Sequence, residues 1–512
     1  MSKPPQPQIT LPEIPDDIIE EMTTYLFNSG CIQPIPSTKR SITHIPTIIT
    51  PTPVPKPFYD KIIFYQIGFN KLYSRLSEDF SFLKENLTPL INADPHIKRH
   101  LNLLDKVINN KNKPSISITL VKNDYTIEKN NKFIYQTNYK TLNTSFAIYT
   151  DLMEQFHSYF SERYPELYKQ YTPENKMILP MNNPHYKGFI RSTYDTIIKV
   201  LKEKYGTDDF QKMVIVFITS NDFSKRKLIQ GEIQLIEKYI WTTYNIITKC
   251  MTFQEISKQC SYDKDTNIYT YKSKPISMFY YYNDLDDKEL NTENDWQIHE
   301  QIQMSTSIKI PDIQSYLSAH PLFQYLLTKN EVASKYLNSE LLLNDLVRFY
   351  RVKMLFKEYD EQKQKELVQI VTDNLTKYIV KSQMKGTNSV CTGENILTVI
   401  PSSTCEITDE LAHTVIEDKI ELVENEGIML VNGKATKVSL GSEYSVYGLI
   451  IKDGENYLEN KVVGFSVKSE DRKKIEDCVV DESECAIDFP CLLDIEVNLQ
   501  VDESKKDESA TE

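Results

Sequence analysis

The stretch Val214-Ile215-Val216-Phe217-Ile218-Thr219 decides the fold class of this chain. A short, continuous run of apolar and β-branched residues is typical of a strand that is buried on both faces. We expect a helix after this strand, ending near residue 244, and a second buried strand at 278–282. Because parallel neighbouring strands need a crossover between them, this alternation predicts a parallel α/β layer.

The sequence before this layer predicts both helices and strands. Apolar spacings of three and four predict helices at 16–27, within 58–110, at 149–164 and at 187–205, and alternation predicts strands at 115–122 and 133–141. We expect Asp16 and Asp94 to cap helices and Gly30 to end one. Proline-rich residues 50–55 predict an extended polyproline stretch, and a Lys/Asn-rich turn is predicted after Asn123-Asp124-Tyr125, which follow the strand at 115–122.

The sequence after the layer changes from helical to strand-like patterns. Helices are predicted at 295–306, 313–327 and 340–359, and strands at 378–381, 415–420, 428–431, 446–451 and 461–467. The expected class is therefore mixed α/β. The expected units are an arm with one helix at 1–57, the first part of the main core at 58–205, an α/β substrate domain at 206–330, a C-terminal region at 331–495 and an acidic, disordered tail at 496–512.

The composition argues against several classes of protein. Lys and Arg number 59 against 72 Asp and Glu, and the resulting net charge of −13 argues against sequence-independent nucleic-acid binding. The longest apolar runs are far shorter than the roughly 20 residues of a membrane span. No apolar segment follows Met1, and the eight cysteines form no C-x-x-C pair. We therefore expect a cytoplasmic protein with reduced thiols, no membrane contact and no secretory signal.

Glycine is scarce and unevenly placed. The chain has 13 glycines in 512 residues, whereas an average composition of about 7% predicts roughly 36. Five lie before Gly386, and eight lie from Gly386 to Gly464. Loops that cradle phosphate depend on glycine for close backbone approach. This scarcity excludes a Walker loop or a dinucleotide fingerprint early in the chain and places any nucleotide site in the C-terminal third.

Short motifs in a fixed order carry a resemblance to a known family. Residues 296–312 contain Trp296, Ser305 and Ile308-Lys309-Ile310-Pro311-Asp312. Further segments are Thr50-Pro51-Thr52-Pro53, Lys122-Asn123-Asp124-Tyr125, residues 136–146, Tyr378-Ile379-Val380-Lys381-Ser382-Gln383 and Glu443-Tyr444-Ser445-Val446-Tyr447-Gly448. In this order they resemble the eukaryotic glutathione synthetase family. The resemblance implies an ATP-grasp ligase fold, usually in a homodimer, that uses ATP and Mg²⁺ to join γ-glutamylcysteine to glycine.

The positions that the resemblance assigns to Mg²⁺ have changed. The family's metal ligands correspond to Asn138, Lys140 and Lys385 in this chain. Mg²⁺ requires oxygen ligands, mostly carboxylates, and the two lysines would repel it. We therefore predict no metal site here and doubt a Mg²⁺ cofactor.

Substrate positions are altered as well. The resemblance places Lys122, Ser145 and Lys468 at degenerate substrate-binding positions, and Lys468 replaces an arginine without its bidentate fork. The arginine and glycine of a further substrate motif, R-x-G-Y, correspond to Tyr282 and Asp284. We name no catalytic residue.

Three groups survive at positions that contact ATP in the family, namely Lys309, Lys381 and Glu443. They indicate either a residual nucleotide pocket or side chains that persist without a ligand, and ATP stays a possible cofactor.

Three functions remain open from the sequence. The first is a glutathione synthetase-like protein that has lost catalysis and acts as a structural or regulatory partner, as a homodimer or in a heterodimer with an active subunit. The second is a working ATP-dependent ligase with altered metal use or a changed substrate. The third is a metal-free nucleotide or anion binder, in which the ammonium groups of Lys140 and Lys385 replace the charge of the metal.

Overall fold

The fold is described from a computed structural model of the chain. The structure describes residues 11, 13–35, 41–92, 94–129, 133–142, 147–171, 177–178, 188–206, 212–286, 288–339, 343, 352–355, 360–381, 390–400, 414–423, 425–472 and 486–493. Of the expected site residues, Ser145 and Lys385 lie outside this part of the chain.

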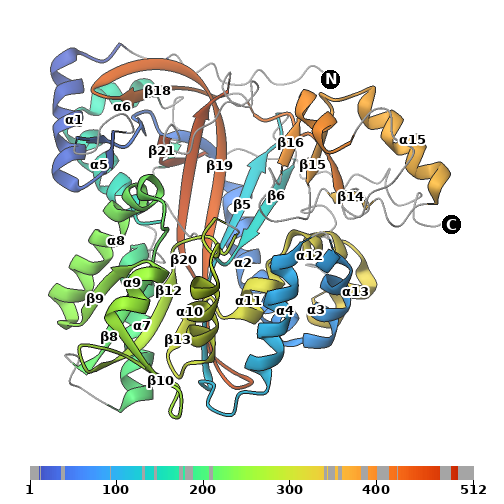
Figure 1. Cartoon of the computed structure of the whole chain (residues 1–512). Coiled ribbons are helices and arrows are strands. Elements are labelled where there is room, and N and C mark those ends of the chain that lie inside the picture. Colours follow the sequence, from blue (N-terminus) through green and yellow to red (C-terminus); the bar gives the residue numbers. More distant parts are fainter. Residues whose placement is uncertain are drawn as a thin grey trace.

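The predicted parallel α/β layer is present. The strands β9, β8, β12 and β13 are parallel neighbours, and the antiparallel strands β11 and β10 extend the sheet. Their bounds are β8 (Val214–Ile218), β9 (Ile247–Met251), β10 (Cys260–Asp263), β11 (Ile268–Tyr271), β12 (Lys274–Tyr281) and β13 (Ile308–Ile310). The helices of this layer are α7 (Phe189–Tyr205), α8 (Phe223–Tyr244), α9 (Phe253–Gln259) and α10 (Glu293–Met304), in the lower left of Figure 1.

A second sheet runs through the centre of the molecule. Its described strands follow the order β18-β3-β21-β20-β19-β5-β6. They are β3 (Thr47–Ile48), β5 (Ile116–Ile127), β6 (Ile134–Lys140), β18 (Asn425–Val431), β19 (Lys434–Asp453), β20 (Asn456–Asp471) and β21 (Ala486–Asp488). The long β19–β20 hairpin stands upright in the middle of Figure 1. One face of this sheet packs on α2 (Lys56–Glu78) and the other on the α/β layer.

Helices cover the remaining faces of the core. Beside α2 lie α3 (Phe80–Leu87), η1 (Thr88–Asn92), α4 (Pro95–Ile108), α11 (Ile313–Ser318), α12 (Pro321–Leu326) and α13 (Asn330–Tyr336). The first part of the chain adds α1 (Asp16–Ser29), β1 (Ile32–Pro34), β2 (Ile42–His44) and β4 (Thr52–Pro55), and α5 (Tyr149–Arg163), α6 (Pro165–Tyr171), β7 (Met177–Ile178) and β22 (Pro490–Leu493) pack nearby. As expected, Asp94 caps α4 and Gly30, with φ of 85°, ends α1.

A separate small sheet lies at the upper right of Figure 1. Its described strands follow the order β14-β17-β15-β16 and are antiparallel. They are β14 (Val352–Leu355), β15 (Tyr378–Lys381), β16 (Val390–Thr392) and β17 (Val415–Asp418), and α15 (Glu361–Thr372) and η4 (Gly393–Thr398) pack with them around their own apolar cluster.

Several local predictions were wrong, and tertiary pairing explains most of them. Residues 50–55 are not a free polyproline stretch, because β4 pairs with β22. The strand predicted at 115–122 is longer and continues through residues 123–125 to Ile127, because β6 and β19 pair with β5 on both sides. The predicted helix at 340–359 contains the strand β14, and most of the remainder lies outside the described residues.

Two helix predictions also need correction. Helix α1 has Pro15, not Asp16, at its N-cap, and no side chain caps it. The single helix predicted at 313–327 is two, α11 and α12, because Pro321 begins a new helix after His320. Proline favours the first turn of a helix and interrupts one already formed.

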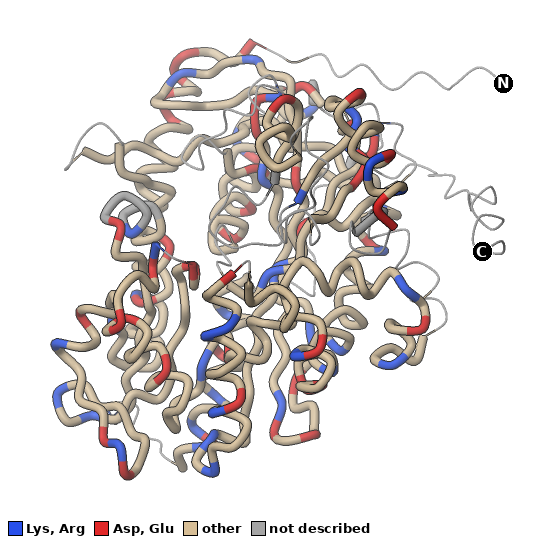
Figure 2. Tube along the Cα trace, turned by 45° about the vertical axis from the view of Figure 1, so that its right-hand side comes forward, with Lys and Arg blue, Asp and Glu red and all other residues tan. Residues whose placement is uncertain are grey.

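Charge is spread over the trace without segregation into separate halves. Figure 2 shows acidic and basic residues interspersed along the described elements. No helix among the described residues has the length and hydropathy that a membrane crossing requires.

Candidate active site

The candidate site begins where one face of β5 changes from apolar to charged. Ile116, Ile118 and Leu120 pack into the core beneath the α/β layer. The next two residues on that face are Lys122 and Asp124, which are 6% and 1% exposed. The Nζ atom of Lys122 lies 3.2 Å from Oδ1 of Asp124, and that oxygen also accepts a 2.7 Å hydrogen bond from the Ser445 hydroxyl. The pair is therefore a buried, hydrogen-bonded ion pair.

The neighbouring strands extend this charged face. Glu443 of β19 pairs in register with Lys468 of β20. Glu443 Oε1 lies 3.9 Å from Lys122 Nζ, and Lys468 Nζ lies 2.8 Å from Glu470 Oε1. The site thus alternates positive and negative side chains across three adjacent strands.

Strand β6 brings the expected metal positions to the edge of this face. Asn138 pairs in register with Asp124, and Lys140 pairs with Lys122. Asn138 is half-buried and Lys140 is exposed. The structure therefore brings Lys122, Asn138, Lys140, Glu443 and Lys468 onto neighbouring positions of adjacent strands.

Electrostatics tie these groups to one another. Burial alone lowers the pKa of Lys122, but Asp124, Tyr447 and Glu443 more than offset this, so its pKa lies above the usual value. Burial raises the pKa of Asp124, but Lys122 and Lys140 outweigh it and the net pKa is lowered. Burial, followed by Asp124, raises the pKa of Glu443. Lys122 and Asp124 are thus both charged at neutral pH.

These residues do not fit a magnesium ion. The carboxylates of Asp124 and Glu443 share this face with Lys122, Lys140 and Lys468, whose ammonium groups all act on Glu443. With Glu470 beside Lys468, a divalent cation there would meet as many ammonium groups as carboxylates, and the lysines would repel it. Within the part of the chain that the structure describes, no group of three or more His, Cys, Asp or Glu residues has an arrangement that could hold a metal.

Lys381 lies on the small sheet and reaches the central sheet from there. Its Nζ donates to the Thr137 carbonyl of β6 at 3.3 Å and lies 2.9 Å from Glu417 Oε1 of β17. Both side chains of this ion pair are largely buried, with exposed fractions of 17% and 10%. Lys381 therefore links the small sheet to the edge strand that carries Asn138 and Lys140.

Lys309 has a different environment from the other site residues. It lies on β13 in the lower part of Figure 1, whereas β15, which carries Lys381, is at the upper right. Its Nζ is buried and donates to the Ser305 carbonyl at 3.0 Å. The charged groups that act on it are Asp312 and Lys204, neither of which acts on Glu443.

The buried amine of Lys309 should make the stability of the protein depend on pH. Burial lowers its pKa from 10.5 to about 7. Between these values the unfolded chain binds more protons than the folded one, so stability rises with pH across that window. We expect Lys309→Met to stabilise the protein at pH 6 by about 3 kcal/mol, after loss of the bond to Ser305, with a gain that shrinks towards pH 10.

Urea denaturation at several pH values measures this effect, with Lys258→Met at an exposed site as the control. Lys204, whose pKa burial lowers to about 8, titrates beside Lys309 in both proteins. A stability difference between Lys309→Met and the parent that stays constant with pH would contradict the prediction.

The substrate position at Tyr282 is buried. Tyr282 follows β12, is 3% exposed and packs against Phe217 and Tyr280. Burial, followed by Tyr280 and Glu232, raises its pKa well above the usual value. A neutral phenol surrounded by aromatic rings and a carboxylate offers no positive charge to an anionic substrate.

Sequence reasoning missed three partners of the charged groups in the site: Glu417 and Glu470, which pair with lysines, and Ser445, which donates to Asp124. Ser445 and Glu470 lie two residues from Glu443 and Lys468, so strand alternation contained a signal for them. Glu417 is brought to Lys381 by the pairing of β15 with β17, which has no local signal.

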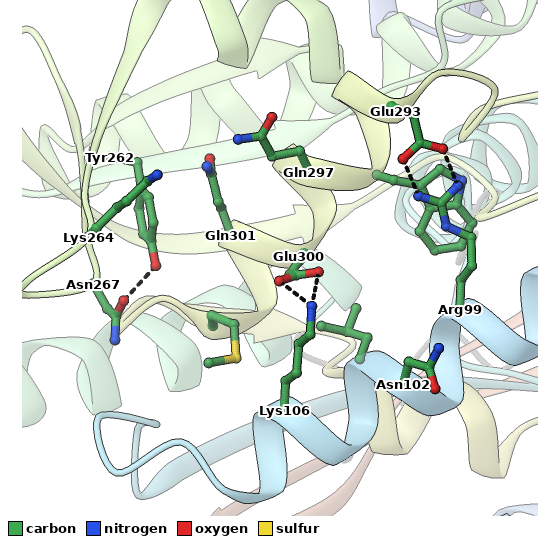
Figure 3. Close-up of a pocket in the computed structure, with 13 residues that line it drawn as sticks. Arg99, Asn102, Lys106, Tyr262, Lys264, Asn267, Glu293, Gln297, Glu300 and Gln301 are labelled. Carbon is green, nitrogen blue, oxygen red and sulfur yellow. Dashed lines mark hydrogen bonds and ion pairs between the residues drawn. The ribbon is translucent and has the colours of Figure 1, made fainter.

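The Trp296 motif packs away from this site and lines a surface pocket of about 540 Å³. Arg99 stacks on the Trp296 ring at 4.4 Å and holds Glu293 by two hydrogen bonds of 2.7 Å. Lys106 holds Glu300 in the same way, at 2.7 and 2.8 Å. Figure 3 shows both pairs bridging α4 and α10, with Tyr262 and Asn267 on the opposite wall. The charged groups of these two pairs are already satisfied, so the motif contributes to packing between the two helices.

Comparisons with known proteins identify the family of this chain. The profile described as "Eukaryotic glutathione synthase, ATP binding domain" matches residues 13–492. The chain is 21% identical over 473 residues to the glutathione synthetase of Dictyostelium discoideum, covering 89% of this chain and 94% of that one. It is 22% identical over 442 residues to the enzyme of Rattus norvegicus, covering 85% and 87%.

A solved structure shows a similar fold. A glutathione synthetase like-effector, GSS30, from Globodera pallida in its apo form superposes with a TM-score of 0.68 at 15% identity, covering 94% of this chain and 99% of that one. The mixed α/β class expected from the sequence is thereby confirmed. With the profile extending over nearly the whole chain, this protein belongs to the eukaryotic glutathione synthase family.

Proposed function

We propose that this chain is a glutathione synthetase-like protein that has lost the ligase reaction and serves as a structural or regulatory partner. The observation that carries the proposal is that the chain's own carboxylates pair with the lysines of the site. Lys122 is held by Asp124, Lys381 by Glu417 and Lys468 by Glu470. An anionic substrate or nucleotide would have to displace these internal partners.

The family reaction needs positive charge that remains available for developing negative charge. Phosphoryl transfer and acyl phosphate chemistry depend on groups that stabilise the transition state more than the ground state. In this chain the expected metal positions carry Asn138 and Lys140, and the substrate position Tyr282 is a buried phenol. An ATP-grasp architecture retained without these groups is a scaffold rather than a ligase.

The direct test is phosphate release from ATP in the presence of γ-glutamylcysteine, glycine and Mg²⁺. We expect no turnover above the rate without enzyme, because Lys122, Lys381 and Lys468 are paired with carboxylates and two of the expected metal positions carry Asn138 and Lys140. An active family enzyme assayed in parallel is the positive control. Turnover well above background would refute the proposal and favour the alternative of a working ligase.

A second experiment separates a lost reaction from an unsuitable scaffold. The triple variant Asn138→Glu, Lys140→Asn and Lys385→Glu restores the acidic and amide groups that the resemblance assigns to the metal. Isothermal titration of ATP with Mg²⁺ should show binding to this variant and not to the parent. Metal-free binding of ATP to the parent in EDTA, abolished by Lys140→Ala, would instead favour the anion-binding alternative.

The partner role is open to a direct assembly test. One relative, 20% identical over 453 residues, is named "Glutathione synthetase large chain" in Schizosaccharomyces pombe, and that name implies a second chain. We propose that this chain pairs with itself or with an active subunit of the same family. Sedimentation of the purified chain alone detects the homodimer, and sedimentation of its mixture with an active family enzyme detects the heterodimer. A monomer in both experiments would rule out the pairing.

A further inference from the structure

The free edge of the α/β sheet is formed by β9. All five residues of this strand pair in parallel with β8, and among the described strands none pairs with its other edge. An unpaired edge presents backbone N–H and C=O groups that can accept another strand. The first four residues of β9 are only half-buried, so this edge lies near the surface.

A pocket of about 560 Å³ wraps around this edge. One wall is α8, which contributes Gln234, Glu237, Lys238 and Trp241, and the other is the β11–β12 turn with Tyr271 and Lys272. Thr248 of β9 hydrogen-bonds to Glu237 on the helix side. The next residue, Lys249, lies over the Tyr271 ring on the opposite side, at 5.8 Å. An added strand would therefore direct alternate side chains to the two walls.

The two walls differ in chemistry. The helix wall presents the Trp241 side chain, which is 54% exposed although large aromatic side chains are usually covered. The opposite wall presents Lys249 and Lys272, with Lys272 Nζ 5.5 Å from the Tyr271 ring centre. Lys238 adds a third positive charge, and Glu237 is the one carboxylate that lines the pocket. Within a protein of net charge −13, this groove is locally basic.

We propose that the edge of β9 binds an extended peptide with alternating acidic and apolar residues by β-strand addition. Main-chain hydrogen bonds would form along β9, apolar side chains would cover Trp241, and carboxylates would meet Lys249 and Lys272. A second copy of the chain does not suit this edge, because two such edges would bring their lysines together. The proposal is independent of whether the family reaction is lost.

The test uses a fluorescein-labelled probe, acetyl-(Val-Glu)₃-Val-amide, and fluorescence anisotropy with the full chain. We expect saturable binding that weakens with added salt. Lys249→Glu/Lys272→Glu should weaken binding at least tenfold, and Trp241→Ala about tenfold. The matched control, Lys258→Glu, reverses a charge on the exposed face of the neighbouring α9 and should bind like the parent. Circular dichroism of each variant verifies folding. The single variant Lys272→Glu, in the β11–β12 turn, tests the contribution of this lysine to probe binding with the least change to the structure.

Two modified probes separate the proposal from general charge attraction. A peptide N-methylated at alternate residues cannot complete a ladder along β9 and should lose binding. A probe with Lys in place of Glu should not bind. Equal binding of the N-methylated probe would overturn strand addition, and equal losses in Lys258→Glu and the double variant would overturn the site. If the chain forms a dimer and Trp241→Ala abolishes it, the β9 edge would bind a second copy of the chain, and the peptide proposal would be overturned.

Discussion

Replacing Lys122 by Met should destabilise the protein by about 3–5 kcal/mol, because it leaves the Asp124 carboxylate charged and buried without its partner. Asp124 is 1% exposed, and once the lysine is removed its carboxylate keeps the hydrogen bond from the Ser445 hydroxyl. Urea denaturation at pH 7, followed by tryptophan fluorescence and circular dichroism, measures the loss. Lys140→Met, at an exposed position on the adjacent strand, should change stability by less than about 1 kcal/mol.

The double variant Lys122→Met/Asp124→Asn tests whether the effect comes from the unpaired charge. An amide keeps the hydrogen bond from Ser445 and removes the charge, so most of the lost stability should return. The pKa of Asp124 is lowered in the folded protein, so its contribution is present above the ordinary pKa of 3.8 and is lost as pH falls through the folded value. The free energies of unfolding of Lys122→Met and the parent should therefore converge as the pH becomes acidic. A double variant as unstable as Lys122→Met would show that lost packing, not charge, dominates.

Gly448→Ala should destabilise the protein by about 3 kcal/mol or more. A Cβ atom at this position would lie 2.2 Å from Oδ1 of Asn70 and 2.7 Å from Nε2 of Gln66. Both side chains are fully buried and belong to a hydrogen-bonded network between α2 and the central sheet. Overpacking costs about 1–3 kcal/mol, and each buried polar group left without a partner adds about as much.

A second glycine provides the matched control for this prediction. Gly454 lies in the β19–β20 turn with φ of 59° and has no neighbouring atom within 4 Å of an added Cβ. Gly454→Ala should therefore cost only the left-handed backbone strain, about 1 kcal/mol. Thermal unfolding of both variants against the parent measures the contrast. Equal losses of stability in the two variants would contradict the prediction, because they would mean that a small shift of α2 makes room for the added Cβ at residue 448.

The contacts around Gly448 also revise the meaning of the glycine scarcity. Glycine is enriched from residue 386 to residue 464. Among the described glycines of this region, Gly427, Gly448 and Gly464 lie in strands where side chains of neighbouring elements would come within 3.4 Å of an added Cβ atom. At these three positions, glycine serves packing of the central sheet. Gly386 itself lies outside the described residues.

Many elements of this fold could be predicted locally, because their signals lie within a few residues of each other. The parallel strands β8 and β12, the cap of α4 by Asp94 and the end of α1 at Gly30 all follow from side-chain type and spacing. The errors at β4 and β14 have a different cause. Their backbone groups are satisfied by β22 and β17, which are distant in sequence, so no local pattern could announce them.

The candidate site shows the same division. The sequence by itself determined the family resemblance and the loss of acidic residues at the expected metal positions, because these depend only on which residue stands at each place. Only the tertiary structure decided that Lys122 is paired with Asp124, Lys381 with Glu417 and Lys468 with Glu470, while Lys309 lies in another environment. The physical reason is that charge pairing depends on strand register and burial, which arise when distant segments pack together.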